Sequence, residues 1–364
     1  MKEQRNNLWS APVWAALLAS GLGVLPGRLA RTAGGAGWIS VAVLPPALVL
    51  LERLVHGRRG HGLAKQVADG GLWGGLLTFI YIICAVPLLA IRLRMGARRL
   101  AATAQEGTGV WIFLLLLAVV AVRLGWGDEA TFLRAAAVSC RILLCALAGV
   151  CLLSLLRLRG GFLWPVWTQD APGVLRGAIY ALGVFGSGVY AVFLPPGRSG
   201  TNRTWLYVGV GAQALAVLCV AGCLGPELAG RLADPWLTLA RGAGVNGTVR
   251  RLESLVSALW LLADLAYLGL LLQAVRRLCA RWLGQRERWS ASALLGLAAV
   301  LALTVLREED TARRMQELLV PALGLLAGVG LPLLLWGIYL VAEGRGKGTS
   351  CPTKKTSKKD EKRC

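Results

Sequence analysis

Ten long apolar segments, separated by short basic connections, constrain this chain more than any other feature. A helix needs about 20 apolar residues to cross the hydrocarbon core of a bilayer, and most of these segments have that length. Only 16% of the residues are charged, whereas soluble domains carry about 25%. The pattern predicts an all-α integral membrane protein with about ten transmembrane helices. The segments cover residues 8–33, 38–55, 72–92, 108–126, 134–156, 173–194, 204–225, 249–278, 290–306 and 316–342.

The charges are distributed as in a membrane protein. The net charge is +21, but the basic residues form no stripe with interleaved aromatic side chains, so we expect no nucleic-acid partner. An even number of spans places both termini on one side, and the Lys and Arg bias of the loops predicts that this side is the cytoplasm. The basic group that follows the third segment opposes this bias. It consists of Arg92, Arg94, Arg98 and Arg99.

The chain divides into a membrane domain and a tail. Residues 1–342 contain all ten apolar segments, whereas residues 343–364 form a basic, low-complexity segment with the composition of a disordered chain. The lipid bilayer is therefore one expected partner of residues 1–342.

Two of the apolar segments contain helix-breaking residues near their centres. The first segment includes Ser20-Gly21-Leu22-Gly23-Val24-Leu25-Pro26, and glycine and proline cost about 1 and 3 kcal/mol inside a helix. The sixth includes Gly183, Gly186 and Gly188. Unpaired backbone groups are costly in hydrocarbon, so a broken helix persists there only where it lines a cavity or holds a ligand. The alternatives for the first segment are a glycine-tolerant helix with a mild kink and a first span that ends near Gly23.

The two predicted breaks lie five segments apart, which is the pattern of two five-helix repeats of inverted topology. We expect these repeats over about 8–156 and 173–342, with broken helices one and six beside a ligand. The carboxylate of the ligand is expected at the N–H groups near Gly21 to Val24, and its ammonium at carbonyls near Gly183 to Gly186. The predicted ligand-binding residues are Ser20, Gly21, Leu22, Gly23, Val24, Tyr81, Gly183, Phe185, Gly186, Ser187 and Trp260.

The eighth segment supplies a polar helical face. An ionised carboxylate near the middle of a span costs at least about 2.5 kcal/mol, so we expect Asp264 to face water or a cation, or to be protonated. Asp264 is the candidate for ion or proton coupling, and the alternative is a structural acid paired with a basic side chain. The residues that recur at helical spacing on this face are Glu253, Ser257, Trp260, Asp264 and Tyr267.

The sequence offers no set of residues typical of an enzyme or a metal site. Its nine cysteines follow no metal-binding spacing, and its two histidines, His56 and His61, lie in one basic loop. We therefore expect no catalytic residue, no metal and no cofactor. Gly324 and Gly328, which lie one helical turn apart, predict a close approach of two helix backbones.

Two stretches carry a resemblance to a known family. Residues 225–268 read GPELAGRLADPWLTLARGAGVNGTVRRLESLVSALWLLADLAYL, which resembles the region before and within the eighth span of spore germination permeases, the B-type subunits of germinant receptors. Residues 20–41, SGLGVLPGRLARTAGGAGWISV, are similar to the first span of that family and its link to the second.

This resemblance implies an amino acid/polyamine/cation permease fold, which is LeuT-like, and a role in sensing a small germinant, typically an amino acid. It also implies a larger A-type membrane subunit and a C-type lipoprotein as partners, and the inner membrane of a spore as the location. Many relatives carry a glutamate in the sixth span, where this chain has Gly186-Ser187-Gly188, so the ligand chemistry at that point does not carry over. We expect a germinant-receptor subunit. The alternatives are a proton-coupled amino acid transporter that uses Asp264 and a structural subunit that binds no ligand.

Overall fold

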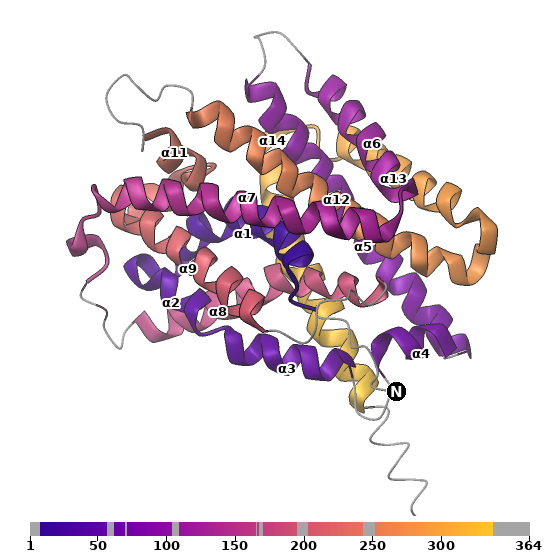
Figure 1. Cartoon of the computed structure of the whole chain (residues 1–364). Coiled ribbons are helices and arrows are strands. Elements are labelled where there is room, and N and C mark those ends of the chain that lie inside the picture. The colour runs from indigo at the N-terminus through magenta and orange to yellow at the C-terminus, as the bar shows by residue number, and fades with distance from the viewer. Residues whose placement is uncertain are drawn as a thin grey trace, which may run out of the picture.

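The computed structural model describes residues 8–56, 62–69, 71–103, 109–164, 166, 170–194, 203–242 and 252–337, so the tail at 343–364 lies outside the described residues. Within these ranges every element of secondary structure is a helix (Figure 1). The longer elements are α1 (Ala11–Ala33), α2 (Gly37–Ala42), α3 (Pro45–His56), α4 (Leu63–Asp69), α5 (Gly71–Thr103), α6 (Val110–Trp126), α7 (Glu129–Leu155), α8 (Ala171–Gly186), α9 (Thr204–Leu224), α10 (Pro226–Arg231), α11 (Pro235–Gly242), α12 (Leu252–Leu283), α13 (Glu287–Thr304) and α14 (Glu309–Leu325). The 3₁₀ helix η4 (Ser187–Phe193) continues α8, and a π-helical turn, η6 (Leu326–Gly330), continues α14.

Seven helical stretches of the described chain are long and apolar enough to cross a membrane, and α6 is a shorter apolar helix. Large apolar side chains also cover much of the outer surface, including Leu116 and Val119 of α6 and Leu297 and Val300 of α13, which are at least half exposed. Exposed apolar surface of this extent is unfavourable in water and favourable in lipid. The predicted all-α membrane class is confirmed, whereas the number of about ten spans and the inverted five-helix repeats stay predictions.

Helix α1 forms the centre of the bundle. It packs against α7, α8, α9 and α12, and α7 passes directly across it in Figure 1. Trp14, Leu17 and Leu25 are fully buried along its length. A helix that is apolar on every side is the type expected in the core of a membrane bundle.

The predicted break in the first span is wrong, because α1 is α-helical without interruption from Ala11 to Ala33. Its small residues instead allow neighbouring helices to approach closely. Gly21 faces the amide of Gln213 on α9, and Gly27 faces Pro235 of α11. The Gln213 Nε2 donates a hydrogen bond of 3.2 Å to the carbonyl of Leu18. Tight packing of this kind holds a Gly- and Pro-containing span helical within a bundle.

The sixth span does change conformation where its glycines lie. The α-helix α8 ends at Gly186 and passes into the 3₁₀ helix η4 at Ser187. A Cβ atom added at Gly186 would overlap the backbone of Gly324, and one added at Gly328 would overlap the backbone of Gly186. Gly183 and Gly186 therefore pack against α14 and η6, which confirms the close approach predicted from Gly324 and Gly328, whereas Gly188 faces Trp9, Val13 and Leu17.

Two other spans differ from their predicted bounds. The second predicted span, 38–55, consists of two helices, α2 and α3. Val43 and Leu44 lie between them. Pro45 and Pro46 follow directly, and neither has an N–H to continue a helix begun before it.

The third predicted span, 72–92, is much longer than expected, since α5 has 33 residues and continues to Thr103. Arg92 and the three arginines after it are therefore helical residues, and their predicted place in a loop is wrong.

Candidate functional site

Three buried charged side chains join α5 to α12. Arg92 and Arg99 lie seven residues, or two helical turns, apart on one face of α5. Arg92 Nη1 donates to Asp264 Oδ1 at 3.0 Å, and Arg99 Nη2 donates to Asp264 Oδ2. The side chains of Arg92, Arg99 and Asp264 are 3%, 8% and 1% exposed. We call these three residues the Arg–Asp–Arg cluster.

The surroundings of the cluster fix both guanidinium groups. Arg92 Nη2 donates a hydrogen bond to Ser20 Oγ, which connects the cluster to α1. The Arg92 guanidinium carbon lies 4.4 Å from the ring centre of Tyr267, and that of Arg99 lies 4.9 Å from the ring centre of Trp260. Both distances are within the range of favourable cation–π contacts. The predicted polar face of the eighth span is therefore confirmed from Ser257 to Tyr267, while the side chain of Glu253 lies outside the described residues.

The cluster retains positive charge and free donors. Two arginines and one aspartate sum to +1, and no other described acid pairs with either arginine. The Nε and Nη1 atoms of Arg99 are buried and have no hydrogen-bond partner among the described residues. A buried donor without a partner is costly, more so on a charged group. The arrangement therefore favours an added anion or acceptor at Arg99.

A cavity of about 260 Å³ lies beside Arg99 and Asp264. Its volume is many times the 10 to 15 Å³ or so that a single water needs. Ala258, an exposed residue, forms part of its lining, so the cavity reaches the protein surface. The lining residues are Gly96, Arg99, Leu100, Ser257, Ala258, Leu261 and Asp264.

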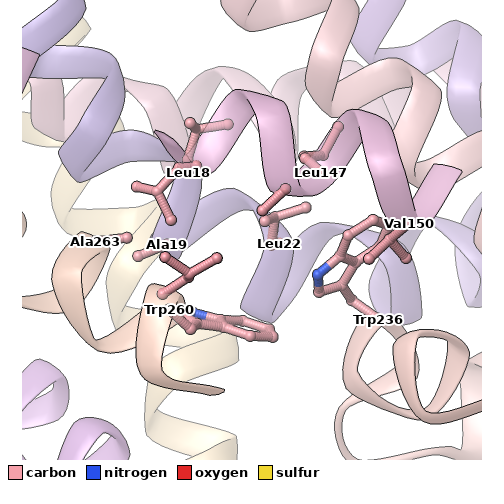
Figure 2. A pocket seen from close by; sticks show the side chains of 11 residues that line it. Leu18, Ala19, Leu22, Leu147, Val150, Trp236, Trp260 and Ala263 are labelled. Atoms are coloured by element: carbon pink, nitrogen blue, oxygen red, sulfur yellow. The ribbon is translucent and has the colours of Figure 1, made fainter. Parts of the chain in front are cut away.

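A second, apolar pocket lies on the α1 side of Trp260 and is shown in Figure 2. Side chains of α1 and α7, with Trp236 and Trp260, converge on it, and its free volume is about 30 Å³. This space holds about two water molecules at most, so it is too small for an amino acid. The cavity at Arg99 is the better candidate for a ligand site.

The structure brings together only part of the predicted ligand set. Ser20, Trp260 and Asp264 meet at the Arg–Asp–Arg cluster. Leu22 lines the apolar pocket, and Gly23 lies against Trp260 and Gln316. The N–H groups of Gly21 to Val24 lie inside the continuous helix α1, so the expected contact of a carboxylate with unwound backbone there is wrong.

The other predicted residues lie in packing contacts. Tyr81 donates from its hydroxyl to the carbonyl of Ala327 at 2.8 Å. Phe185 packs edge-on against Trp14, with 5.4 Å between ring centres. Ser187 Oγ donates to the carbonyl of Val184 at 3.0 Å. Gly183 and Gly186 lie against the backbone of α14, so the carbonyls that were expected to face an ammonium face another helix.

The sequence analysis did not assign Arg92 and Arg99 to the site, because it ended the third span at residue 92 and treated the basic group there as part of a loop. Their spacing offered a signal: Arg92 and Arg99 share one helical face, whereas Arg94 and Arg98 do not lie on it. The structure separates the two pairs in the same way. Arg94 donates to the carbonyl of Arg307, and Arg98 pairs with Glu309 at the start of α14.

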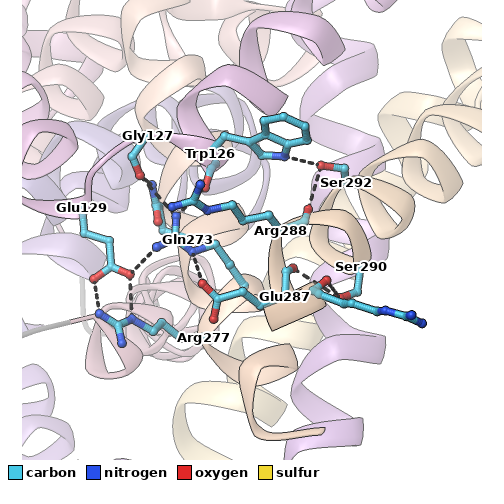
Figure 3. A network of polar contacts seen from close by, with 12 residues as sticks. Trp126, Gly127, Glu129, Gln273, Arg277, Glu287, Arg288, Ser290 and Ser292 are labelled. Carbon is cyan, nitrogen blue, oxygen red and sulfur yellow. Dashed lines mark hydrogen bonds and ion pairs between the residues drawn. The ribbon is translucent and has the colours of Figure 1, made fainter. Parts of the chain in front are cut away.

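A further polar network connects the turn between α6 and α7 to α12 and α13 (Figure 3). Arg277 binds both carboxylate oxygens of Glu129, at 2.6 and 2.7 Å. Gln273 Nε2 donates to the carbonyl of Leu124 at 2.7 Å, and Trp126 Nε1 donates to Ser292 Oγ at 2.8 Å. Every one of these contacts joins two helices, so the network is structural.

Comparison with known proteins identifies one matching family model. Residues 12–311 match the family model described as spore germination protein. No protein of curated function matches the chain.

Proposed function

The chain belongs to the spore germination protein family and is an integral membrane protein, and from this premise we propose that it is a germinant-receptor subunit that binds a small carboxylate-bearing germinant, an amino acid above all. The proposed site is the cavity beside Arg99. In this proposal the protein acts at the inner membrane of a spore, with both termini in the cytoplasm, and works with a larger membrane subunit and a lipoprotein.

The observation that carries the proposal is the incomplete bonding of Arg99. Its Nη2 is bound to Asp264, while Nε and Nη1 have no partner among the described residues. Arg99 is therefore able to bind Asp264 and a ligand carboxylate at the same time. The charge of +1 on the cluster favours the carboxylate, and charge-assisted hydrogen bonds are the stronger ones in proteins.

The same cavity also offers acceptors for an ammonium group. Asp264 and Ser257 both line it, and a carboxylate has about four lone-pair positions, of which the two arginines occupy part. An amino acid thus finds a cation for its carboxylate and an anion for its ammonium within one site. This pairing supports an amino acid over a sugar or a nucleoside.

Binding at this site acts on the contact between α5 and α12. Asp264 is the residue that joins Arg92 and Arg99 across these two helices, and Arg92 extends the link to Ser20 of α1. A ligand that competes for Arg99 and Asp264 stabilises one arrangement of the helices over another. We propose that the partner subunits respond to this shift in population.

The test is equilibrium binding of radiolabelled amino acids to the purified full-length protein. We expect Arg99→Gln to weaken binding at least about tenfold, which corresponds to the loss of a hydrogen bond to a charged group. Arg98→Gln is the matched control, because it removes the same charge from the adjacent residue, which pairs with Glu309 instead. Equal binding by the wild type and Arg99→Gln would reject the site.

One observation favours a second function, proton-coupled transport: a carboxylate, Asp264, lines the cavity in the membrane domain. Uptake of the bound amino acid into proteoliposomes separates the two functions. A sensor binds the amino acid without net flux. A proton-coupled transporter accumulates the amino acid when protons move down an imposed gradient. If no amino acid binds and none is taken up, the structural-subunit alternative is favoured.

A further inference from the structure

A separate cavity lies near the opposite end of α12 from the candidate ligand site. Its volume is about 320 Å³, and it lies between α4, the end of η4 and α12. Arg277 is 13 residues along α12 from Asp264, a distance of about 20 Å. The lining combines two guanidinium groups with apolar side chains: Ala64, Val67, Phe193, Arg277, Leu278 and Arg281.

The two arginines are four residues apart and share one face of α12. Arg277 uses Nε and Nη2 to bind Glu129, as Figure 3 shows. Arg281 Nη2 donates to the carbonyl of Gly71 at 2.9 Å, and its Nη1 is buried with no hydrogen-bond partner among the described residues. No acid pairs with Arg281 among the side chains that the structure describes, so within that part of the chain the cavity contains a cation whose charge is not neutralised.

Gly74 is the residue that allows Arg281 to lie there. A Cβ atom at position 74 would lie 2.6 Å from Arg281 Nη1 and 2.8 Å from the carbonyl oxygen of Gln66. Both distances are shorter than any ordinary contact, so only glycine lets α4 and the Arg281 guanidinium pack on α5 together. The position of the free Nη1 is thus set by the packing of three helices.

The surroundings place this cavity at the depth of lipid headgroups. Trp73, beside Gly74 on α5, is 68% exposed, and Trp282, beside Arg281 on α12, is 49% exposed. Exposed tryptophans gather where the hydrocarbon core meets the headgroups. At that depth a phosphate anion lies directly next to acyl chains, which matches a lining of guanidinium groups and apolar side chains.

We propose that this cavity binds the headgroup phosphate of an anionic phospholipid. The phosphate accepts hydrogen bonds from Arg281 Nη1 and from the edge of Arg277 that Glu129 does not occupy. The start of the acyl chains lies along the apolar lining and the two exposed tryptophans. Basic pockets between transmembrane helices are a general mode of anionic-lipid recognition, and Arg281 supplies the unmatched charge here.

The experiment measures the affinity of the full-length protein, in neutral detergent, for phosphatidylglycerol and for phosphatidylcholine, by the shift of thermal unfolding with added lipid. We expect the wild type to prefer phosphatidylglycerol, and Arg281→Gln to lose about fivefold in affinity for it, the effect of one cation near an anionic lipid. Arg286→Gln is the control, since Arg286 is an exposed arginine outside the cavity and its loss changes the net charge equally.

Arg281→Gln also removes the hydrogen bond between Arg281 and the Gly71 carbonyl, and a second variant tests whether that loss alone lowers the lipid affinity. Ala64→Glu places a carboxylate in the cavity and leaves Arg281 unchanged, so it competes with the phosphate and lowers the lipid preference in the same way. Equal stabilisation by both lipids, or an unchanged preference in both variants, overturns the proposal. An Arg281-dependent stabilisation by inorganic phosphate as large as that by phosphatidylglycerol also overturns it, because the occupant is then a free anion.

Discussion

Arg92 and Asp264 form an ion pair of 3.0 Å between side chains that are 3% and 1% exposed. A buried pair of this kind contributes little net stability over an apolar pair of the same shape, because desolvation offsets the attraction. Removing one partner is different, since the other charge is left buried. The packing of α5 against α12 therefore depends on the Asp264 carboxylate, and so does the packing of α5 against α1, because Arg92 also binds Ser20.

Asp264→Asn leaves two guanidinium groups buried without an anion. We expect it to lower the free energy of unfolding by about 3 to 5 kcal/mol, measured as a lower midpoint of thermal unfolding in detergent. Glu309→Gln is the control, because its pair with Arg98 is largely exposed and such pairs contribute about 0 to 1 kcal/mol. Equal midpoints for the two variants would contradict the central place of Asp264.

Arg99→Lys tests the geometry of the guanidinium rather than its charge. A lysine retains the positive charge beside Asp264 but has one nitrogen, so it does not reproduce the separate donors at Nε and Nη1. We expect normal abundance in the membrane and at least about tenfold weaker amino acid binding. Binding equal to that of the wild type would show that charge alone is sufficient and that the free donors of Arg99 have no role.

Gly186→Ala tests the packing of the sixth span. The added methyl group overlaps the backbone of Gly324, and overpacking of this type costs about 1 to 3 kcal/mol. Gly211→Ala is the matched control in another membrane helix, since a Cβ atom there meets no atom within 4 Å. We expect a lower unfolding midpoint for Gly186→Ala only. A loss of germinant binding at full stability would instead restore the predicted ligand contact at Gly186.

Asp128 predicts a pH dependence at the start of α7. The Thr131 N–H and hydroxyl donate to Asp128 Oδ2 at 3.0 and 3.1 Å, and these hydrogen bonds, the backbone bond most of all, lower the pKa of Asp128 below its ordinary value. Its contribution to stability is therefore complete above the unfolded-state pKa and is lost as the pH falls through the folded-state pKa.

The measurement is the unfolding midpoint between about pH 5 and pH 3. Asp128→Asn retains a capping side chain but has no titrating group, so its midpoint should fall less steeply with acid than that of the wild type. An unchanged slope in Asp128→Asn would show that other acids dominate the acid response.

The class of fold follows from the sequence because apolar segments of membrane length have few alternatives in lipid. Each of the ten predicted segments overlaps a helix, and the change of helix type after Gly186 lies where the glycines of the sixth span predict it. Whether α1 is broken or continuous does not follow from the sequence in this way. The local cost of Gly21 and Gly27 in a helix favours a break, and the close contacts with Gln213 and Pro235 that accompany the unbroken helix are long-range.

The candidate site could be predicted in part for a related reason. The helical spacing of Trp260, Asp264 and Tyr267 identifies one wall of it, because spacing along one helix is visible in the sequence. The partners Arg92 and Arg99 lie beyond the apolar part of α5. Arginine ordinarily ends a span, whereas here ion pairs of Arg92 and Arg99 with Asp264 of α12, and of Arg98 with Glu309 of α14, accompany the continued helix.

The length of α5 has a consequence for how a solute reaches Arg99. A helix of 33 residues is about 50 Å long, whereas the hydrocarbon is about 30 Å thick and helices tilt by up to about 40°. Even at the steepest tilt α5 is longer than the hydrocarbon is thick, and with Trp73 of its first turns at the headgroups, as proposed above, the final turns, which contain Arg99, lie near the opposite aqueous boundary. Under the proposed function, we therefore expect a dissolved molecule to reach the Arg99 guanidinium from that aqueous boundary rather than through the lipid.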